Sequence, residues 1–400
     1  MIRIRKKAEG SLSFCLFFQR SACVLVFLLT VCFGFLPSSG FPQTPLSGFN
    51  PATLAYAKGS AFLEARAFGG NNAFALKSLF LDEWDVYFEP DGRNTADMYW
   101  KADSGVIYKG WRIAGFYRGE LFIKANRDTV EILRMINLKQ DLPVGRNFTI
   151  DLKANGFSAA GVEISRGVEL DGILKGLKAG VTARYLRGER IQSGRIAGNV
   201  TPNDRKSYDF DLFLDYVYDD NYVYDRWDME SKFYGNGYSF DFGVRYDMGG
   251  KAAVGVLLRD IMGRIYWKDI PYTTADATSK IKSYDDDGYQ QFRPTIRGYE
   301  SYKDYSQRIP LKTDIDFSYS INPFILGSTV NLIESRPLYW LTVHYNATGD
   351  FQISVKYNTN YEVFSAGLAY KSAMLEICSS DTRLNRAGAV GLAASFRYEW

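Results

Sequence analysis

The chain has 400 residues, of which 16% are aromatic, with 28 tyrosines and 28 phenylalanines. Its 48 basic and 45 acidic residues nearly balance, which gives no reason to expect a nucleic-acid partner. His344 is the single histidine, which excludes a metal site built from several histidines, and we expect neither a metal nor a cofactor.

The first 40 residues have the layout of a cleaved signal peptide. A basic start precedes the apolar run 22–36, Pro37 ends that run, and small residues stand at −3 and −1 of a cleavage after Gly40. The run is short for a membrane-spanning helix, which needs about 20 apolar residues. Residues 1–40 hold five basic residues and one acid, so the remaining chain has 43 basic and 44 acidic residues.

Residues 41–400 are expected to form a single domain, a closed antiparallel transmembrane β-barrel of about 14–18 strands. No segment of this range is long and apolar enough for a transmembrane helix. An exported chain without such helices can span a membrane only as a closed barrel, because lipid offers no partner to an open sheet edge. The aromatic content suits the interfacial girdles of such a barrel. A soluble all-β sandwich is the alternative.

Period-two alternation of apolar and polar residues predicts individual strands. Such alternation places one set of side chains toward lipid and the other toward the lumen. Each run approaches the roughly 9–11 residues that a tilted strand needs to cross a bilayer. In chain order the runs are 147–153, 177–185, 209–218, 240–248, 311–321, 339–346, 351–357 and 390–400.

The connections are predicted from turn residues and from the loss of alternation. Asn155-Gly156 and Asn236-Gly237 read as hairpin dipeptides. The stretch of about 270–308 reads as one long irregular loop, and counting hairpins back from Trp400 places it on the extracellular side. Residues 128–138 read as a short helix that plugs the lumen, sits at the barrel mouth or simply joins two strands.

The charged and polar residues on the inward side of these runs are the candidate lumen lining. Both signs occur, which is compatible with a weakly selective aqueous pore or with ion pairs that fill the barrel. The set comprises Lys178, Arg184, Asp209, Asp211, Asp215, Asp241, Arg245, Asp247, Lys312, Asp314, Asp316, His344, Lys356, Arg397 and Glu399.

The chain ends on an aromatic strand. Phe396, Tyr398 and Trp400 fall on one face, and a terminal strand of this kind resembles the signal read by the outer-membrane barrel-assembly machinery. We therefore expect this machinery and outer-membrane lipids as partners, and the cell outer membrane as the location.

Near the expected mature N-terminus stands Asn50-Pro51-Ala52, followed by Gly69-Gly70-Asn71-Asn72. With the signal peptide and the terminal aromatic strand, this motif resembles the long-chain fatty-acid transporter superfamily, and looks closer to an uncharacterised bacterial branch. The resemblance implies a barrel with a small hydrophobic ligand. Only about nine residues lie between the predicted cleavage site and Asn50. The corresponding segment of those transporters, which feeds an N-terminal hatch, is longer. The alternative is that Asn50-Pro51 is a simple turn into the first strand.

Three functions are compatible with these observations. The first is a transporter or channel for small or hydrophobic solutes. The second is a structural, secretion-associated or surface-binding barrel, with the tyrosines of 270–308 as a contact surface. The third, a membrane hydrolase, is disfavoured, because His344 alone could serve as general base and its parity places it in the lumen. We expect no catalytic residue.

Overall fold

The computed structural model describes residues 48–78, 84, 87–204, 208–220, 233–279, 282–284, 290–292, 295–334, 336–348 and 350–400. The predicted signal peptide of residues 1–40 lies outside these ranges. Within them, sixteen strands form one antiparallel sheet that closes on itself, and two further strands form a small hairpin. The prediction of an all-β barrel is confirmed.

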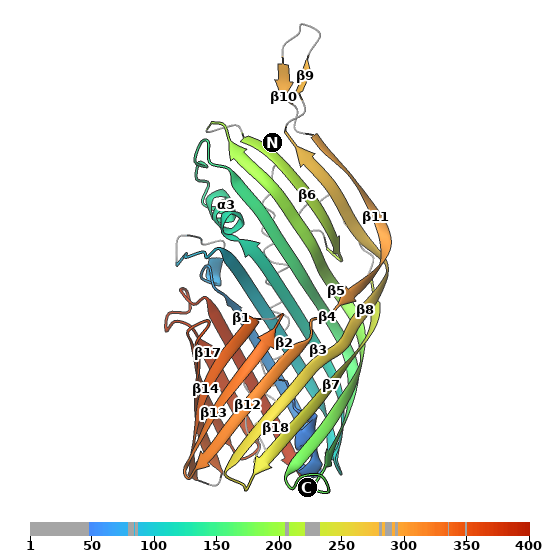
Figure 1. Ribbon diagram of the computed structural model, residues 1–400, viewed down its shortest axis with the longest axis vertical. Helices are drawn as coiled ribbons and strands as arrows, with labels where there is room; N and C mark the ends of the chain where they lie inside the picture. Colours follow the sequence, from blue (N-terminus) through green and yellow to red (C-terminus); the bar gives the residue numbers. More distant parts are fainter. Residues whose placement is uncertain are drawn as a thin grey trace.

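The elements follow one another along the chain as an up-and-down meander (Figure 1). Among the elements that the structure describes are the 3₁₀ helix η1 (Pro51–Tyr56) and the α-helix α3 (Arg127–Asn137). The small hairpin consists of β9 (Lys282–Tyr284) and β10 (Gln290–Phe292). The strands of the barrel are β1 (Ser60–Asn71), β2 (Arg93–Tyr108), β3 (Trp111–Asn126), β4 (Phe148–Glu169), β5 (Leu177–Pro202), β6 (Tyr208–Tyr218), β7 (Gly235–Met248), β8 (Ala252–Thr278), β11 (Thr295–Arg308), β12 (Lys312–Ile321), β13 (Phe324–Ile333), β14 (Arg336–Thr348), β15 (Phe351–Asn358), β16 (Val363–Tyr370), β17 (Ala373–Ser379) and β18 (Ala389–Glu399).

Two positions around the barrel are each occupied by a pair of strands, one above the other. β6 and β7 both pair with β5 on one side and β8 on the other. β11 and β12 both pair with β8 on its other edge. A circuit through the described residues therefore crosses 14 strands, closing through the pairing of β1 with β18. This number lies within the predicted range.

The barrel wall is much taller on one side than on the other (Figure 1). β4, β5 and β8 have 22, 26 and 27 residues, whereas β15, β16 and β17 have 8, 8 and 7. We call the part formed by β4, β5, β6, β8 and β11 the tall wall. It rises at the end opposite the C-terminus.

Two connection predictions are wrong. Residues 270–308 are not an irregular loop, because β8 runs to Thr278 and β11 begins at Thr295, so most of this stretch extends the tall wall. The described residues of this stretch lie at the barrel end opposite the C-terminus (Figure 1). Asn155-Gly156 and Asn236-Gly237 lie inside β4 and β7, where cross-strand pairing overrides their turn preference.

The outer face of the barrel is apolar and is bordered by two rows of aromatic side chains. All of these side chains are at least one third exposed, and such rows are typical of the two membrane interfaces of a barrel. The row at the C-terminal end contains Tyr108, Trp111, Tyr319, Phe324, Tyr345, Tyr370, Tyr398 and Trp400. The second row contains Tyr117, Tyr185, Tyr238, Tyr266, Tyr339 and Phe364.

The predicted helix at 128–138 is confirmed as α3. It begins after Asn126, whose side-chain oxygen accepts a hydrogen bond from the backbone N–H of Thr129 at 3.2 Å. This is the usual capping of a helix N-terminus. Among the residues that the structure describes, no helix is long and apolar enough to cross a membrane.

The helix α3 covers the outer face of the tall wall. Its residue Ile132 packs against Phe148 of β4. Phe148 has the same strand parity as Val162, which is 59% exposed on the outside of the barrel. Because strand side chains alternate between faces, α3 lies outside the barrel and does not plug the lumen.

Candidate functional site in the barrel interior

The strand β3 shows how alternation separates the two faces of the wall. Trp111, Ile113 and Tyr117 are exposed on the outer face. Arg112 and Arg118 alternate with them and are only 2% and 4% exposed. Since successive strand residues point to opposite faces, this strand places its charged side chains in the interior.

Ten charged side chains in the interior form one connected set of ion pairs, which we call the central ionic network. Five are basic and five are acidic, and each is less than 10% exposed. They come from β2, β3, β4, β5, β7, β8 and β12. The members are Lys101, Asp103, Arg112, Arg118, Glu120, Glu163, Arg184, Asp241, Asp260 and Lys312.

Glu163 is the acceptor that joins three of the cations. It accepts hydrogen bonds from Lys101 Nζ at 3.1 Å, from Arg184 Nε at 2.6 Å and from Arg112. Asp103 binds Lys101, also at 3.1 Å, and Arg112. Charge-assisted hydrogen bonds of this kind are about twice as strong as neutral ones, so they hold β2, β3, β4 and β5 together across the interior.

Asp260 has the corresponding role on the other side of the network. Its carboxylate accepts two hydrogen bonds from the guanidinium of Arg118, at 2.8 and 2.9 Å, and one from Lys312 Nζ at 2.9 Å. Lys312 also pairs with Glu120 at 2.8 Å. Arg184 lies 4.0 Å from Asp260 and connects the two halves of the network.

Asp260 reaches the interior because of a bulge in β8. Its backbone φ is +59°, in the left-handed region, and both Arg259 and Asp260 are buried although they are consecutive. A bulge inserts an extra residue and re-aims a side chain. The backbone N–H of Asp260 donates to Asp241 Oδ1 at 3.0 Å, which secures this conformation.

Two further buried ion pairs lie in the interior. Arg259 binds Asp314 at 2.9 Å, and Asn331 donates to the same carboxylate at 2.7 Å. Lys356 binds Glu376 at 2.6 Å. His344 is 7% exposed on the neighbouring strand β14. Buried charges are stable only when they are paired in this way.

The N-terminal segment, residues 48–57, crosses the interior without joining the sheet. Asn50 caps η1, because its side-chain oxygen accepts from the backbone N–H of Ala52 at 3.0 Å. The side-chain amide of Asn50 donates to the carbonyl of Val244 in β7 at 3.3 Å. The backbone N–H of Gly48 donates to Asp314 at 2.9 Å, and the ring of Phe49 lies on the guanidinium of Arg112.

Three glycines in neighbouring strands make room for this segment. Gly167 pairs with Gly180 across β4 and β5, and Gly180 pairs with Gly243 across β5 and β7. We call these three residues the glycine row. A Cβ atom on any of them would come within 2.5 Å of an atom of Asn50 or Pro51. Asn50-Pro51-Ala52 is therefore a docked motif inside the barrel and not a free turn.

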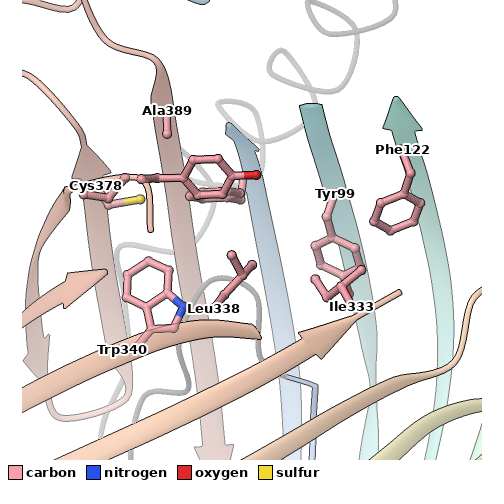
Figure 2. Packing of buried hydrophobic residues seen from close by; sticks show 10 residues of the cluster. Tyr99, Phe122, Ile333, Leu338, Trp340, Cys378 and Ala389 are labelled. Carbon is pink, nitrogen blue, oxygen red and sulfur yellow. The ribbon is translucent and has the colours of Figure 1, made fainter. Parts of the chain in front are cut away.

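Apolar side chains fill other parts of the interior. One cluster gathers Trp340, Leu338 and Ile333 with Cys378 and Ala389 (Figure 2). Phe68 of β1 also belongs to this cluster. Cys378 is a free thiol. A second cluster surrounds Trp267 on the side of the tall wall; its other members include Phe116, Phe157, Leu186, Ile191, Val217, Ile265, Ile270 and Ile309.

The structure brings most of the predicted lumen residues into the interior. Arg184, Asp241 and Lys312 belong to the central ionic network, and Asp314, His344 and Lys356 are also buried. The partly exposed members at the C-terminal end of the barrel are Lys178, Arg245, Asp247, Asp316, Arg397 and Glu399.

Three of the predicted lumen residues are not part of this arrangement. Asp209, Asp211 and Asp215 lie on β6, in the tall wall, and none of them is buried. They share the inward parity of the wall, but β6 stands above β7 and so above the ionic network. Asp215 lies 3.9 Å from Lys303 there.

Most of the central ionic network comes from residues that sequence reasoning did not select. Lys101, Asp103, Arg112, Arg118 and Glu120 lie in β2 and β3, before residue 145. The alternation of Trp111, Ile113 and Tyr117 could have predicted β3. Val162 and Ile164, which flank Glu163, could have predicted that Glu163 points inward. No period-two signal points to Asp260, because the bulge reverses its direction.

In the described ranges, no three histidine, cysteine, aspartate or glutamate side chains are grouped so that they could hold a metal ion. No curated protein sequence matches the chain. The profile of a family of unknown function, DUF5723, matches residues 66–377. The chain belongs to the DUF5723 family.

Solved structures of transport barrels are similar to this DUF5723 member over most of their length. A deltaS2S3 mutant of the monoaromatic hydrocarbon channel TodX is 10% identical, with a TM-score of 0.48 over 92% of this chain and 96% of that chain. The toluene transporter TodX of P. putida is 9% identical, with a TM-score of 0.43 over 88% and 92%. A FadL homologue of Pseudomonas aeruginosa is 12% identical, with a TM-score of 0.42 over 90% and 95%.

At these identities the similarity to the transport barrels concerns the fold alone. The family profile confirms the prediction that the chain is similar to an uncharacterised family.

Proposed function

We propose that the protein is an outer-membrane transporter or channel for small or hydrophobic solutes, and that the structure represents its closed state. The apolar outer face between two aromatic rows supports a membrane location. The polar interior supports a solute path. Buried ion pairs and apolar clusters fill that interior at present, so passage requires part of it to move.

The observation that carries the proposal is the way the N-terminal segment is held. Residues 48–57 lie inside the barrel, and strand pairing begins only at Ser60. The segment is attached by a few hydrogen bonds, by contact with the glycine row and by the stacking of Phe49 on Arg112. The segment can therefore leave the barrel interior without breaking the backbone hydrogen bonds between the strands.

Conductance across planar bilayers tests this function. We expect purified full-length protein to show rare or small channel events, and a variant lacking residues 48–57 to show frequent, larger ones. Uptake of a small sugar and of a hydrophobic dye by proteoliposomes would then distinguish the two solute classes. A folded deletion variant that conducts no ions and admits neither probe would contradict the proposal.

The terminal strand supports a second part of the proposal, assembly by the barrel-assembly machinery. Tyr398 of β18 and Trp400, the residue after this strand, are 48% and 60% exposed. They remain accessible even though β18 pairs with β1 and β17. Removal of Trp400 should lower the amount of folded barrel in the outer membrane, and unchanged assembly would count against this role.

A further inference from the structure

Next to the central ionic network lies a cavity of about 20 Å³. On the same measure, roughly 10–15 Å³ is enough for one water molecule, so the cavity admits a single small particle. Gly48 and Phe49 of the N-terminal segment form part of its wall. Its charged lining consists of five basic side chains, Arg66, Lys101, Arg118, Arg184 and Arg259, and two acidic ones, Glu120 and Asp260.

The two carboxylates of this lining lie in ion pairs. Asp260 accepts from Arg118 and Lys312, and Glu120 pairs with Arg118 at 2.7 Å and with Lys312. Arg118 still has an N–H to offer, because its Nε has no hydrogen-bond acceptor among the described residues. A buried donor without an acceptor costs free energy, and an anion in the cavity would supply one.

We propose that this cavity is a binding site for one small monatomic anion, a halide such as chloride. The excess of basic over acidic side chains around it favours negative charge, and space for about one water-sized particle favours a small anion. Arginine donors are well suited to an anion stripped of its water, because guanidinium is weakly hydrated and remains charged. This inference is independent of the transport function, since it concerns binding to the closed barrel.

Bromide is the probe, because it scatters anomalously and has nearly the size of chloride. Crystals of the full-length protein grown in sodium bromide should show an anomalous peak between Arg118, Lys101 and Arg66. In detergent solution, the thermal unfolding midpoint should rise saturably with bromide or chloride relative to gluconate at equal ionic strength. The absence of the peak, or equal midpoints in bromide and gluconate, would overturn the proposal.

Charge variants give effects of opposite sign. Asp260→Asn removes a competing negative charge and should tighten bromide binding by about tenfold or more, and Arg118→Gln should weaken it by a similar factor. Glu120→Gln makes the same charge change as Asp260→Asn and serves if the latter does not fold. Asp151→Asn, on an exposed carboxylate of the tall wall, is the matched control and should bind bromide like the wild type.

The variants also separate a specific site from a general salt effect. If Asp151→Asn altered bromide binding as much as Asp260→Asn, the salt effect would not come from the cavity, and the proposal would fail. If Arg118→Gln folded and kept the wild-type affinity, the assignment of this arginine as a donor to the anion would be wrong.

Discussion

Gly180 lies directly against Pro51. A Cβ atom on Gly180 would be 2.3 Å from the carbonyl carbon of Pro51, well inside van der Waals contact. The contact joins the middle of the glycine row to the start of η1. The N-terminal segment can therefore dock only because residue 180 of β5 has no side chain.

Gly180→Val should therefore displace the segment and open the lower part of the interior. We expect larger and more frequent channel events in planar bilayers than for the wild type, with little change in strand content by circular dichroism. Gly172→Val is the matched control, because Gly172 is exposed in a turn and a Cβ there has no neighbour within 4 Å. A folded Gly180→Val barrel with wild-type conductance would show that the segment does not close the path.

Removal of the Asp260 carboxylate should strongly destabilise the barrel. Asp260→Ala removes one of the two carboxylates that bind both Arg118 and Lys312, and breaking a buried ion pair costs about 3–5 kcal/mol. Asp151→Ala removes an exposed carboxylate that pairs with Arg195 at 3.0 Å, and such pairs contribute about 1 kcal/mol or less. Urea unfolding in lipid vesicles measures both, and equal losses would argue against the network as a stabilising element.

The apolar cluster around Trp340 should be sensitive to truncation. Leu338 is fully buried in it, and Leu→Ala substitutions in such surroundings cost about 2–5 kcal/mol. Leu384→Ala is the same substitution at a side chain that is 71% exposed, and should change the free energy of unfolding by less than about 0.5 kcal/mol. A Leu338→Ala variant as stable as Leu384→Ala would mean that this part of the interior is not tightly packed.

A pH effect is expected at Asp219, which lies just after β6, above the second aromatic row. Its carboxylate accepts from the backbone N–H of Ile191 at 2.9 Å. Burial raises the pKa of Asp219 from 3.8 to about 6, against the opposing effects of this hydrogen bond and of Arg190. The folded state therefore holds the proton more tightly than the unfolded chain.

The sign of the pH dependence follows from this difference. Below pH 4 both states are protonated at Asp219; between about pH 4 and 6 only the folded state keeps its proton. The contribution of Asp219 to stability therefore falls as the pH rises through this window and is constant above it. Asp219→Asn should remove this slope in urea unfolding between pH 4 and 7, whereas Asp151→Asn should retain it. An unchanged slope in Asp219→Asn would contradict the raised pKa.

Alternation in the sequence was enough to predict β4, β5, β6, β7, β12, β14, β15 and β18 and the inward direction of Arg184, Asp241 and Lys312, but it did not predict β8, β11, β13, β16 or β17. This works because the period of two is a direct consequence of strand geometry. It could not reveal which inward charges meet, since Glu163 and Lys101 are 62 residues apart and come together only when β2, β3 and β4 are aligned in register.

Other features depended on the closed barrel itself. The local sequence does not predict the bulge at Asp260, because an aspartate does not by itself indicate a positive φ. The glycine row also has no local signal, since Gly167, Gly180 and Gly243 become neighbours only through the register of three strands. Asn155-Gly156 showed the opposite error, a strong local turn preference that pairing with β3 and β5 overrides.

Because β6 stands above β7 and β11 stands above β12, the height of the wall can vary independently of the number of strands around the barrel. Both changeovers occur beside β8, so residues added to β6, β8 and β11 would lengthen one side while the lower cylinder kept its 14 strands. In other members of the family, the strands on this side can therefore be longer or shorter while the number of strands around the lower cylinder stays the same.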